Sequence, residues 1–291
     1  MIDLHMHTNY IDGEDSVIEI LRKCEEIKLN LISITDHDVC EAYNELKNIN
    51  IKNYFSGKII TGIELNALIN NNRIEILGYN YDLDYINNYL KNKYKNNHEE
   101  VKQISEIKQM KNKCEKLGIK INNKEFNFNK KWSFRFMHEL IKENEENKKY
   151  FTEEEWKDVQ IFYRQCCYDP NGILNIDYSE FVPDINEVIE VIHNAGGKAF
   201  LAHLFRYKET EKEAKDLLNN IVKNTKIDGI ECFYKCFTKE QQLFLANFCK
   251  NNNLLISGGS DYHGENKKNI KLGIDIPKEF TNFIDLLTEK S

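Results

Sequence analysis

The sequence predicts an α/β protein with a helical insertion. Short apolar runs recur along the chain and end in polar, chemically reactive residues, and the segments between them carry apolar residues at helical spacing. This alternation of strand and helix is typical of a parallel sheet. The middle of the chain lacks strand-like runs and is rich in Lys, Glu and Asn, which favours helices there.

Several apolar runs have the length and composition of buried strands. They are residues 31–38 (LISITDHD), 59–67 (IITGIELNA), 73–80 (RIEILGYN), 198–204 (KAFLAHL), 227–233 (IDGIECF) and 254–263 (LLISGGSDYH). Helical spacing precedes two of these runs, at 15–29 and at 185–197, and the second helix closes on glycine, a common stop signal. In a parallel barrel, polar residues at the carboxyl ends of strands gather on one face.

The predicted insertion covers residues 89–165. Two helix-compatible stretches, 98–118 and 133–159, account for most of it, and no strand-like run interrupts them. We therefore expect one α/β domain in two parts, residues 1–88 and 166–291, separated by this helical insertion.

Charge and composition restrict the classes of partner. A formal net charge of -7 and a sequence pI near 5.7 disfavour binding to duplex DNA or to an anionic membrane. A phosphorylated substrate would therefore have to be captured by bound cations. No leader-like segment opens the sequence, and no stretch approaches the ~18 apolar residues of a membrane span. We expect a cytoplasmic protein whose eight cysteines, without paired CxxC motifs, are reduced and mostly buried.

The sequence begins with a metal-binding pattern. His5 and His7 lie two residues apart, so in a strand both imidazoles point to one face and can reach one ion. Further candidates follow at the predicted strand ends, and together they make ten nitrogen or oxygen donors: His5, His7, Asp12, Asp36, His37, Glu64, Glu75, His203, Asp261 and His263. Such mixed sets suit Mn, Fe or Zn in open catalytic sites. Ten donors exceed the needs of one ion, which indicates two or three clustered ions.

Five motifs carry a family resemblance. DLHMHT, ITDHD, GIEL, LAH and GSDYHG, in this order, resemble those of the PHP (polymerase and histidinol phosphatase) family of metal-dependent phosphoesterases. The insertion, the segment VIHNAGGKAFLAHLFRY and the chain length are similar to the subgroup that removes the 3'-phosphate from nucleoside 3',5'-bisphosphates and trims short RNA from its 5' end. The resemblance covers nearly the whole chain and implies a distorted (β/α)7 barrel with a trinuclear metal site.

The resemblance also implies how the ligands divide among the ions. One ion would take His5, His7, Glu64 and Asp261. A second would take Asp12, His37 and His263, and a third would take Glu64, Glu75 and His203. Asp36 fits better as a partner that orients a ligand.

The expected cofactors are two or three divalent ions, with manganese first and iron or zinc as alternatives. Glu75 stands where the subgroup usually has histidine. Its carboxylate adds negative charge and favours hard ions such as Mn or Mg.

Two arginines are candidates for phosphate recognition. Arg206 closely follows a predicted metal ligand, and Arg135 resembles a phosphate-binding arginine of the subgroup's insertion. A guanidinium group matches phosphate in a bidentate manner, although surface salt bridges are the alternative for both residues. His138 lies on the same predicted helix face as Arg135 and is a third candidate contact. Trp132 and Phe134 could stack on a base or pack in a core.

The predicted activity is hydrolysis of a nucleotide phosphomonoester by a hydroxide that bridges two metal ions. The 3'-phosphate of a nucleoside 3',5'-bisphosphate is the first candidate, and Asp261, His203 and Arg206 are the expected catalytic residues. Alternatives are a 5'-3' exoribonuclease on short RNA, a cyclic-phosphate dihydrolase and a histidinol phosphate phosphatase. A metal-stabilised scaffold without activity is the non-enzymatic alternative. A small phosphorylated substrate is thus the expected partner, rather than duplex DNA or a membrane.

Overall fold

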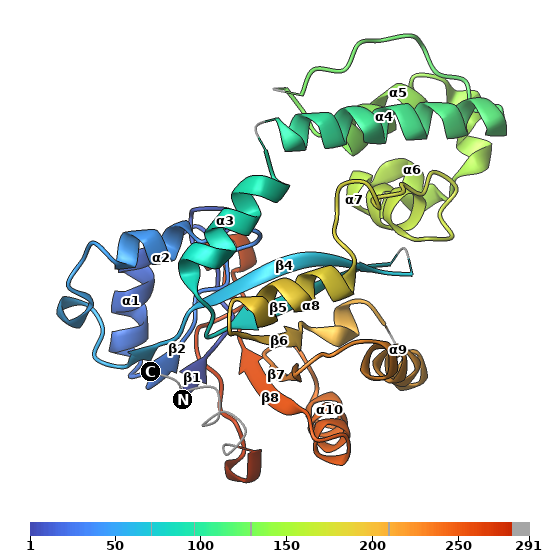
Figure 1. Cartoon of the computed structure of the whole chain (residues 1–291). Coiled ribbons are helices and arrows are strands. Elements are labelled where there is room, and N and C mark those ends of the chain that lie inside the picture. Colours follow the sequence, from blue (N-terminus) through green and yellow to red (C-terminus); the bar gives the residue numbers. More distant parts are fainter. Residues whose placement is uncertain (71, 96, 129, 209, 281–291) are drawn as a thin grey trace. The chain divides into compact units, whose positions relative to one another are not determined.

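The computed structural model describes residues 1–70, 72–95, 97–128, 130–208 and 210–280. The chain divides into two compact units (Figure 1). The α/β unit comprises Met1–Ala67, Arg73–Lys93 and Pro183–Ser291, and the helical unit comprises Leu68–Asn72 and Tyr94–Val182. These boundaries differ from those expected from the sequence, where the helical segment begins at 89 and ends at 165.

The strands form two sheets. The three-stranded sheet has the order β1-β2-β3, and its strands are parallel: β1 (Ile2–Asp3), β2 (Leu31–Ile32) and β3 (Lys58–Ile59). The five-stranded sheet follows the chain order: β4 (Gly62–Ile69), β5 (Asn72–Tyr79), β6 (Lys198–Leu201), β7 (Gly229–Tyr234) and β8 (Leu255–Gly259). β6, β7 and β8 pair in parallel, whereas β5 and β6 are antiparallel.

Isolated pairings connect the two sheets. The backbone of Met6 bridges to Tyr262 beyond β8, and His37 bridges to Glu64 on β4. Leu4 also donates its N–H to the carbonyl of Gly258 at 3.1 Å. The prediction of a mixed α/β fold is confirmed, but the pairings among the described residues do not establish a closed barrel.

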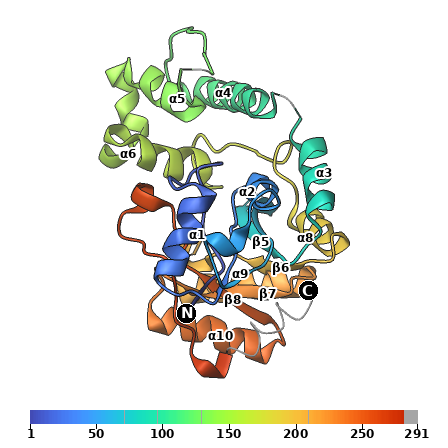
Figure 2. The same cartoon turned by 90° about the vertical axis from the view of Figure 1, so that its left-hand side faces the viewer.

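Helices cover the sheets. α1 (Val17–Glu26) lies beside α2 (Glu41–Leu46), as both views show (Figures 1 and 2). The α/β unit continues with α3 (Leu83–Lys93), α8 (Ile185–Asn194), α9 (Glu211–Asn224) and α10 (Lys239–Asn251). Short helical turns follow at η1 (Ile51–Asn53), η4 (Leu204–Arg206), η5 (Gly264–Lys267) and η6 (Lys278–Phe280).

Local sequence explains where these helices begin and end. Ser16 starts α1 with a reciprocal capping box to Glu19, and buried apolar residues recur along the inner face of the helix. α8 ends at Asn194, and Gly196 then takes a φ of +77°, a left-handed conformation that glycine adopts without strain. Both helices lie within the segments whose spacing predicted them.

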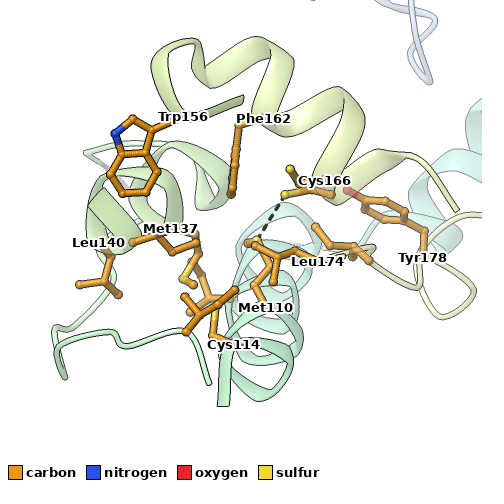
Figure 3. Close-up of a cluster of buried hydrophobic side chains, with 14 of the residues drawn as sticks. Met110, Cys114, Met137, Leu140, Trp156, Phe162, Cys166, Leu174 and Tyr178 are labelled. Carbon is orange, nitrogen blue, oxygen red and sulfur yellow. Dashed lines mark hydrogen bonds between the residues drawn. The ribbon is translucent and has the colours of Figure 1, made fainter. Parts of the chain in front are cut away.

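The helical unit has its own core. Its elements are α4 (His98–Leu117), α5 (Ser133–Lys142), η2 (Glu145–Tyr150), α6 (Glu153–Lys157), α7 (Val159–Ile161) and the π-helical η3 (Phe162–Tyr168). Met110, Met137, Trp156 and Phe162 contribute to one buried cluster (Figure 3). Such packing gives this unit an apolar core of its own, to which Leu68 near the end of β4 also contributes.

The structure shows the state of the cysteines and the length and polarity of the helices. All eight cysteines are free thiols, and only Cys236 is exposed. Every helix among the described residues is too short or too polar to cross a lipid bilayer.

Asp3 joins the first strand to the segment after the last strand. Its buried carboxylate accepts hydrogen bonds from Ser260 N (2.9 Å), Ser260 Oγ (2.6 Å) and Gly273 N (2.8 Å). The backbone N–H of His5 is a further donor at 3.3 Å. One side chain thereby fixes β1 against residues 260–273, which carry part of the site described below.

Replacing Asp3 by asparagine tests this role. The amide has one acceptor oxygen, so its NH2 group would face donors that Asp3 now satisfies. We expect Asp3→Asn to lower the free energy of unfolding by about 3 kcal/mol, measured by denaturant titration. Asp84→Asn, at a largely exposed ion pair, is the matched control with an expected loss of about 0.5 kcal/mol. Equal losses in both variants would contradict this account.

Candidate metal centre

A cavity of about 290 Å³ opens where the strands of the α/β unit end. It is lined by Asp12, His37, Glu64, Glu75, His203, Arg206, Asp261, His263, Asn266 and Lys267. Glu64 and Glu75 lie within β4 and β5, and His203 and Asp261 closely follow β6 and β8, so the fold brings distant parts of the sequence to one place. His5 and His7, which follow β1, are fully buried and contact the same cluster.

Glu64 lies at the centre of the cluster. Its Oε2 atom is 3.1 Å from His5 Nε2, 3.2 Å from His7 Nε2 and 3.3 Å from His37 Nδ1. Its Oε1 atom is 2.8 Å from His203 Nε2. Burial opposes ionisation of Glu64, but the charges of the neighbouring histidines hold the pKa of this carboxyl well below its usual range. Glu64 is therefore an ionised, fully buried carboxylate surrounded by imidazoles.

Asp12 and His263 form a second group with His7 and His37. Asp12 Oδ2 lies 3.1 Å from His263 Nε2 and 3.8 Å from His37 Nε2, and Asp12 Oδ1 lies 3.5 Å from His7 Nδ1. Partial burial opposes its charge, yet the hydrogen bond to His263 and the nearby imidazoles lower the pKa of Asp12 to about 2. This group occupies the more exposed side of the cluster, because the Asp12 side chain is 46% exposed.

Asp261 presents its two oxygens to different surroundings. Oδ1 faces imidazoles, at 3.3 Å from His7 Nε2 and 3.4 Å from His263 Nδ1. Oδ2 accepts hydrogen bonds from Tyr234, Arg206 and Lys267. The backbone of Asp261 has a φ of 57°, a left-handed conformation that is uncommon for residues other than glycine and that concentrates at functional sites.

Glu75 and His203 complete the cluster. His203 Nε2 lies 3.4 Å from Glu75 Oε2, and His37 Nδ1 lies 4.0 Å from Glu75 Oε1. Tyr207 holds Glu75 from the other side, since its hydroxyl donates to Oε2 at 3.1 Å and accepts the backbone N–H of Glu75 at 3.0 Å. The carboxylate at position 75 is thus fixed toward the imidazoles.

The donors fit divalent metal ions. Four groups of three or four residues each offer ligand atoms that lie within 4.8 Å of one another inside the group. All of these residues are histidines, aspartates or glutamates. Buried ring nitrogens of His7 and His37 have no hydrogen-bond partner, although carboxylates lie near them. Buried polar atoms normally have partners, so unpaired nitrogens directed at carboxylates indicate positions for cations.

Buried acids around the cluster orient its ligands. Glu231 Oε1 lies 2.9 Å from His5 Nδ1, and its Oε2 accepts the backbone N–H of His203 at 2.9 Å. Asp36, which the sequence suggested as an orienting residue, accepts from the N–H and hydroxyl of Thr8, both at 2.6 Å. It therefore fixes the turn that follows His7.

Sequence reasoning missed several members of the site. Glu231, Tyr207, Tyr234 and Lys267 were not singled out. The one available signal was Glu231, a charged residue between the apolar residues Ile230 and Cys232 of the run 227–233. The other three become neighbours of the ligands only through folding.

The remaining predicted contacts lie in the helical unit. Arg135 is exposed, with its guanidinium 5.5 Å from the ring centre of Phe134. His138 is buried, and its Nε2 pairs with the backbone carbonyl of Glu155 at 3.0 Å. A buried ring with an internal partner is a core residue, so the structure argues against the predicted contact of His138 with substrate. Trp132 is 53% exposed, and Phe134 packs beside Tyr163.

Comparison with known proteins agrees with this geometry. The PHP domain family matches residues 3–233. The chain belongs to the PHP family. This PHP protein is 26% identical to a 5'-3' exoribonuclease of Haemophilus influenzae, over 90% of its own chain and 89% of that protein. It is 23% identical to the 5'-3' exoribonuclease Rnm of Escherichia coli, over 90% of its own chain and 84% of that protein.

Solved structures share the fold of this PHP protein. An amidohydrolase from Chromobacterium violaceum, solved with bound sulfate and no metal, superposes with a TM-score of 0.66 at 20% identity, covering 99% of this chain and 95% of that one. A protein of Bifidobacterium adolescentis, provisionally described as a metal-dependent phosphoesterase, gives 0.58 at 18% identity, covering 98% and 94%. Membership of the PHP family, together with the clustered imidazoles and carboxylates, makes this protein a metal-dependent hydrolase of phosphoric esters.

Glu231→Gln tests the orienting role of Glu231. The amide keeps the shape but loses the charge that holds His5 Nδ1, so we expect metal affinity to fall about 10- to 100-fold. Competition with a chromophoric chelator measures this change. Glu190→Gln, on the exposed face of α8, is the control. Wild-type affinity in Glu231→Gln would contradict the assignment.

Metal removal gives a second prediction, about pH. Burial opposes a charge on His7, but the contacts with Asp261 and Glu64 raise its pKa from 6.5 to about 9. The folded metal-free protein therefore binds this proton more tightly than the unfolded chain does. Its contribution to stability is complete below pH 6.5 and is lost as the pH rises to about 9.

Binding of a divalent ion must displace this proton. We expect proton release on metal binding near pH 7.5, measured by titration calorimetry in buffers of different ionisation enthalpy, and little release above about pH 9. Denaturant titration of the metal-free protein measures the accompanying stability. A stability that rises between pH 6.5 and 9 would show that His7 is neutral there.

Proposed function

We propose that this PHP protein hydrolyses the 3'-phosphate ester of a nucleotide that carries a 5'-phosphate. Nucleoside 3',5'-bisphosphates are the first candidate substrates. The observation that carries the proposal is Glu64, whose two oxygens face four imidazoles within 3.3 Å. A carboxylate in such surroundings is suited to bridge ions, and closely spaced ions suit phosphoester hydrolysis.

The proposed ligand sets follow the sequence analysis. His5, His7, Glu64 and Asp261 would hold one ion, Asp12, His37 and His263 a second, and Glu64, Glu75 and His203 a third. Nitrogen and oxygen donors without thiolate support manganese, with iron or zinc as alternatives. We further propose that the two sheets and their bridges correspond to a distorted (β/α)7 barrel.

Bound divalent ions would supply a nucleophile at neutral pH and neutralise the charge that develops on the phosphoryl group. The chain's own residues position the reaction. Glu231 directs His5 Nε2 at the centre by occupying its Nδ1. Tyr234 donates to Asp261 Oδ2 at 2.7 Å and so keeps Oδ1 turned toward the imidazoles. Arg206, which lines the cavity, offers guanidinium N–H groups to phosphate oxygens.

Trimming of short RNA from the 5' end is the second candidate. The relatives from H. influenzae and E. coli are named 5'-3' exoribonucleases. Both reactions can break the same bond, between a 3'-oxygen and phosphorus next to a nucleoside with a 5'-phosphate. They differ in what else this phosphorus carries, which is either terminal oxygens alone, as in a bisphosphate, or the 5'-oxygen of the remaining RNA chain.

Hydrolysis assays with added Mn²⁺ test both candidates. The substrates are adenosine 3',5'-bisphosphate, a short 5'-phosphorylated RNA, a cyclic nucleotide and histidinol phosphate. We expect release of phosphate and adenosine 5'-monophosphate from the bisphosphate. Glu64→Gln should reduce this activity to background because the bridging charge is lost, and exposed Glu41→Gln should retain it.

The other outcomes are decisive as well. Release of mononucleotides from RNA without hydrolysis of the bisphosphate would favour the exoribonuclease. Hydrolysis of only the cyclic nucleotide or only histidinol phosphate would identify that compound class, rather than a nucleotide 3'-phosphate, as the substrate. No hydrolysis by protein with verified bound metal would contradict the proposal and favour a scaffold.

A further inference from the structure

Two cationic side chains share one carboxylate oxygen at the cavity. Lys267 Nζ donates to Asp261 Oδ2 at 2.7 Å, and Arg206 Nη1 donates to the same oxygen at 3.0 Å. Arg206 follows β6 and Lys267 ends η5, so they approach Asp261 from separate elements. Both line the cavity.

Each cation has more N–H groups than its bond to Asp261 uses. The Oδ1 atom of Asp261 is already directed at His7 and His263, and Glu75 adds a further attraction to Arg206. Both cations also reach solvent, since the Arg206 side chain is 47% exposed and that of Lys267 is 30% exposed, while Asp261 is nearly buried. Two partly exposed cations beside one buried carboxylate oxygen thus line the cavity.

The segment that carries Lys267 is anchored. Asn266 Nδ2 donates to the carbonyl of Asp12 at 3.0 Å, and the N–H of Glu265 donates to Glu14 Oε2 at 2.8 Å. Gly264 has a φ of +69°, and a Cβ atom there would lie 2.9 Å from Glu14 Cβ. These contacts hold η5 against the turn after His7, so the orientation of Lys267 toward the cavity is set before any ligand arrives.

We propose that Lys267 and Arg206 together bind the phosphate group of the substrate that is not cleaved. The proposal rests on the proposed function, in which this group is the 5'-phosphate. Asp261 lies between the two cations and the imidazoles, so an anion held by Lys267 and Arg206 is one side chain away from the ligand cluster. A phosphate dianion is complementary to two adjacent cations, and the guanidinium adds directional hydrogen bonds.

Binding of adenosine 5'-monophosphate and adenosine tests the proposal without turnover. The metal-loaded protein is titrated with each compound by calorimetry. We expect Lys267→Met to weaken binding of the monophosphate by about tenfold or more, because one charged hydrogen bond is lost, while adenosine binding changes little. Lys267→Arg should recover most of the affinity. Lys268→Met is the matched control, since Lys268 is 75% exposed and pairs only loosely with Glu265, at 3.8 Å.

Kinetics provide an independent measurement. The ratio of kcat/KM for adenosine 3',5'-bisphosphate to that for adenosine 3'-monophosphate reports on recognition of the 5'-phosphate. We expect this ratio to fall about tenfold in Lys267→Met. Metal content is determined for each variant, because loss of metal would lower both rates together.

Two results would overturn the proposal. Equal losses for both substrates, with unchanged affinity for the monophosphate, would mean that Lys267 only positions Asp261 or contacts the reacting phosphate. Wild-type protein that binds the monophosphate no better than adenosine would show that the pair is not a phosphate site. If the wild type cleaves neither nucleotide but binds the monophosphate through Lys267, the proposed function fails and this inference stands.

Discussion

The architecture of the site depends on one buried charge. Glu64 is fully buried yet ionised, and the cost of removing a carboxylate from water is large unless cations or donors surround it. The residues that surround it come from the segments that follow β1, β2 and β6. Each of these segments must therefore be positioned for Glu64 to be tolerated. The same crowding of histidines around one carboxylate is what suits the position to divalent ions.

Further buried acids support this arrangement from outside. Asp3, Asp36 and Glu231 accept hydrogen bonds from backbone N–H groups of segments that carry ligands. A buried carboxylate that accepts such bonds defines the path of a loop, because each donor must keep its partner. The ligands thus lie on rigid supports, although only Glu64 and Glu75 belong to strands and the others follow them. Rigid support of this kind is what metal sites require for fixed coordination geometry.

The sequence predicts much of the site because its signals are local. His5 and His7 alternate along one strand, and Asp261 and His263 follow an apolar run, so their types and positions can be read together. Contacts between distant segments leave no such signal. Tyr207 and Lys267 each follow a candidate metal ligand by a few residues in the sequence. Only the folded chain brings Tyr207 to Glu75 and Lys267 to Asp261. His138 illustrates the converse, since helix spacing placed it beside Arg135 but could not show that the ring is buried. A closed barrel would likewise depend on pairings between distant segments, which no local pattern reveals.

The pairing of the first strand with the last strand has a consequence for biosynthesis. Leu4 bonds to Gly258 and Met6 bridges to Tyr262, so the start of the chain meets its partner only after more than two hundred residues have been added. Contacts of such long sequence separation form late and slow the folding of a domain. A ribosome that has made β1 through β7 therefore carries a nascent chain with several imidazoles exposed and no finished centre. The full set of candidate ligands is therefore present only after Asp261 and His263 have been added.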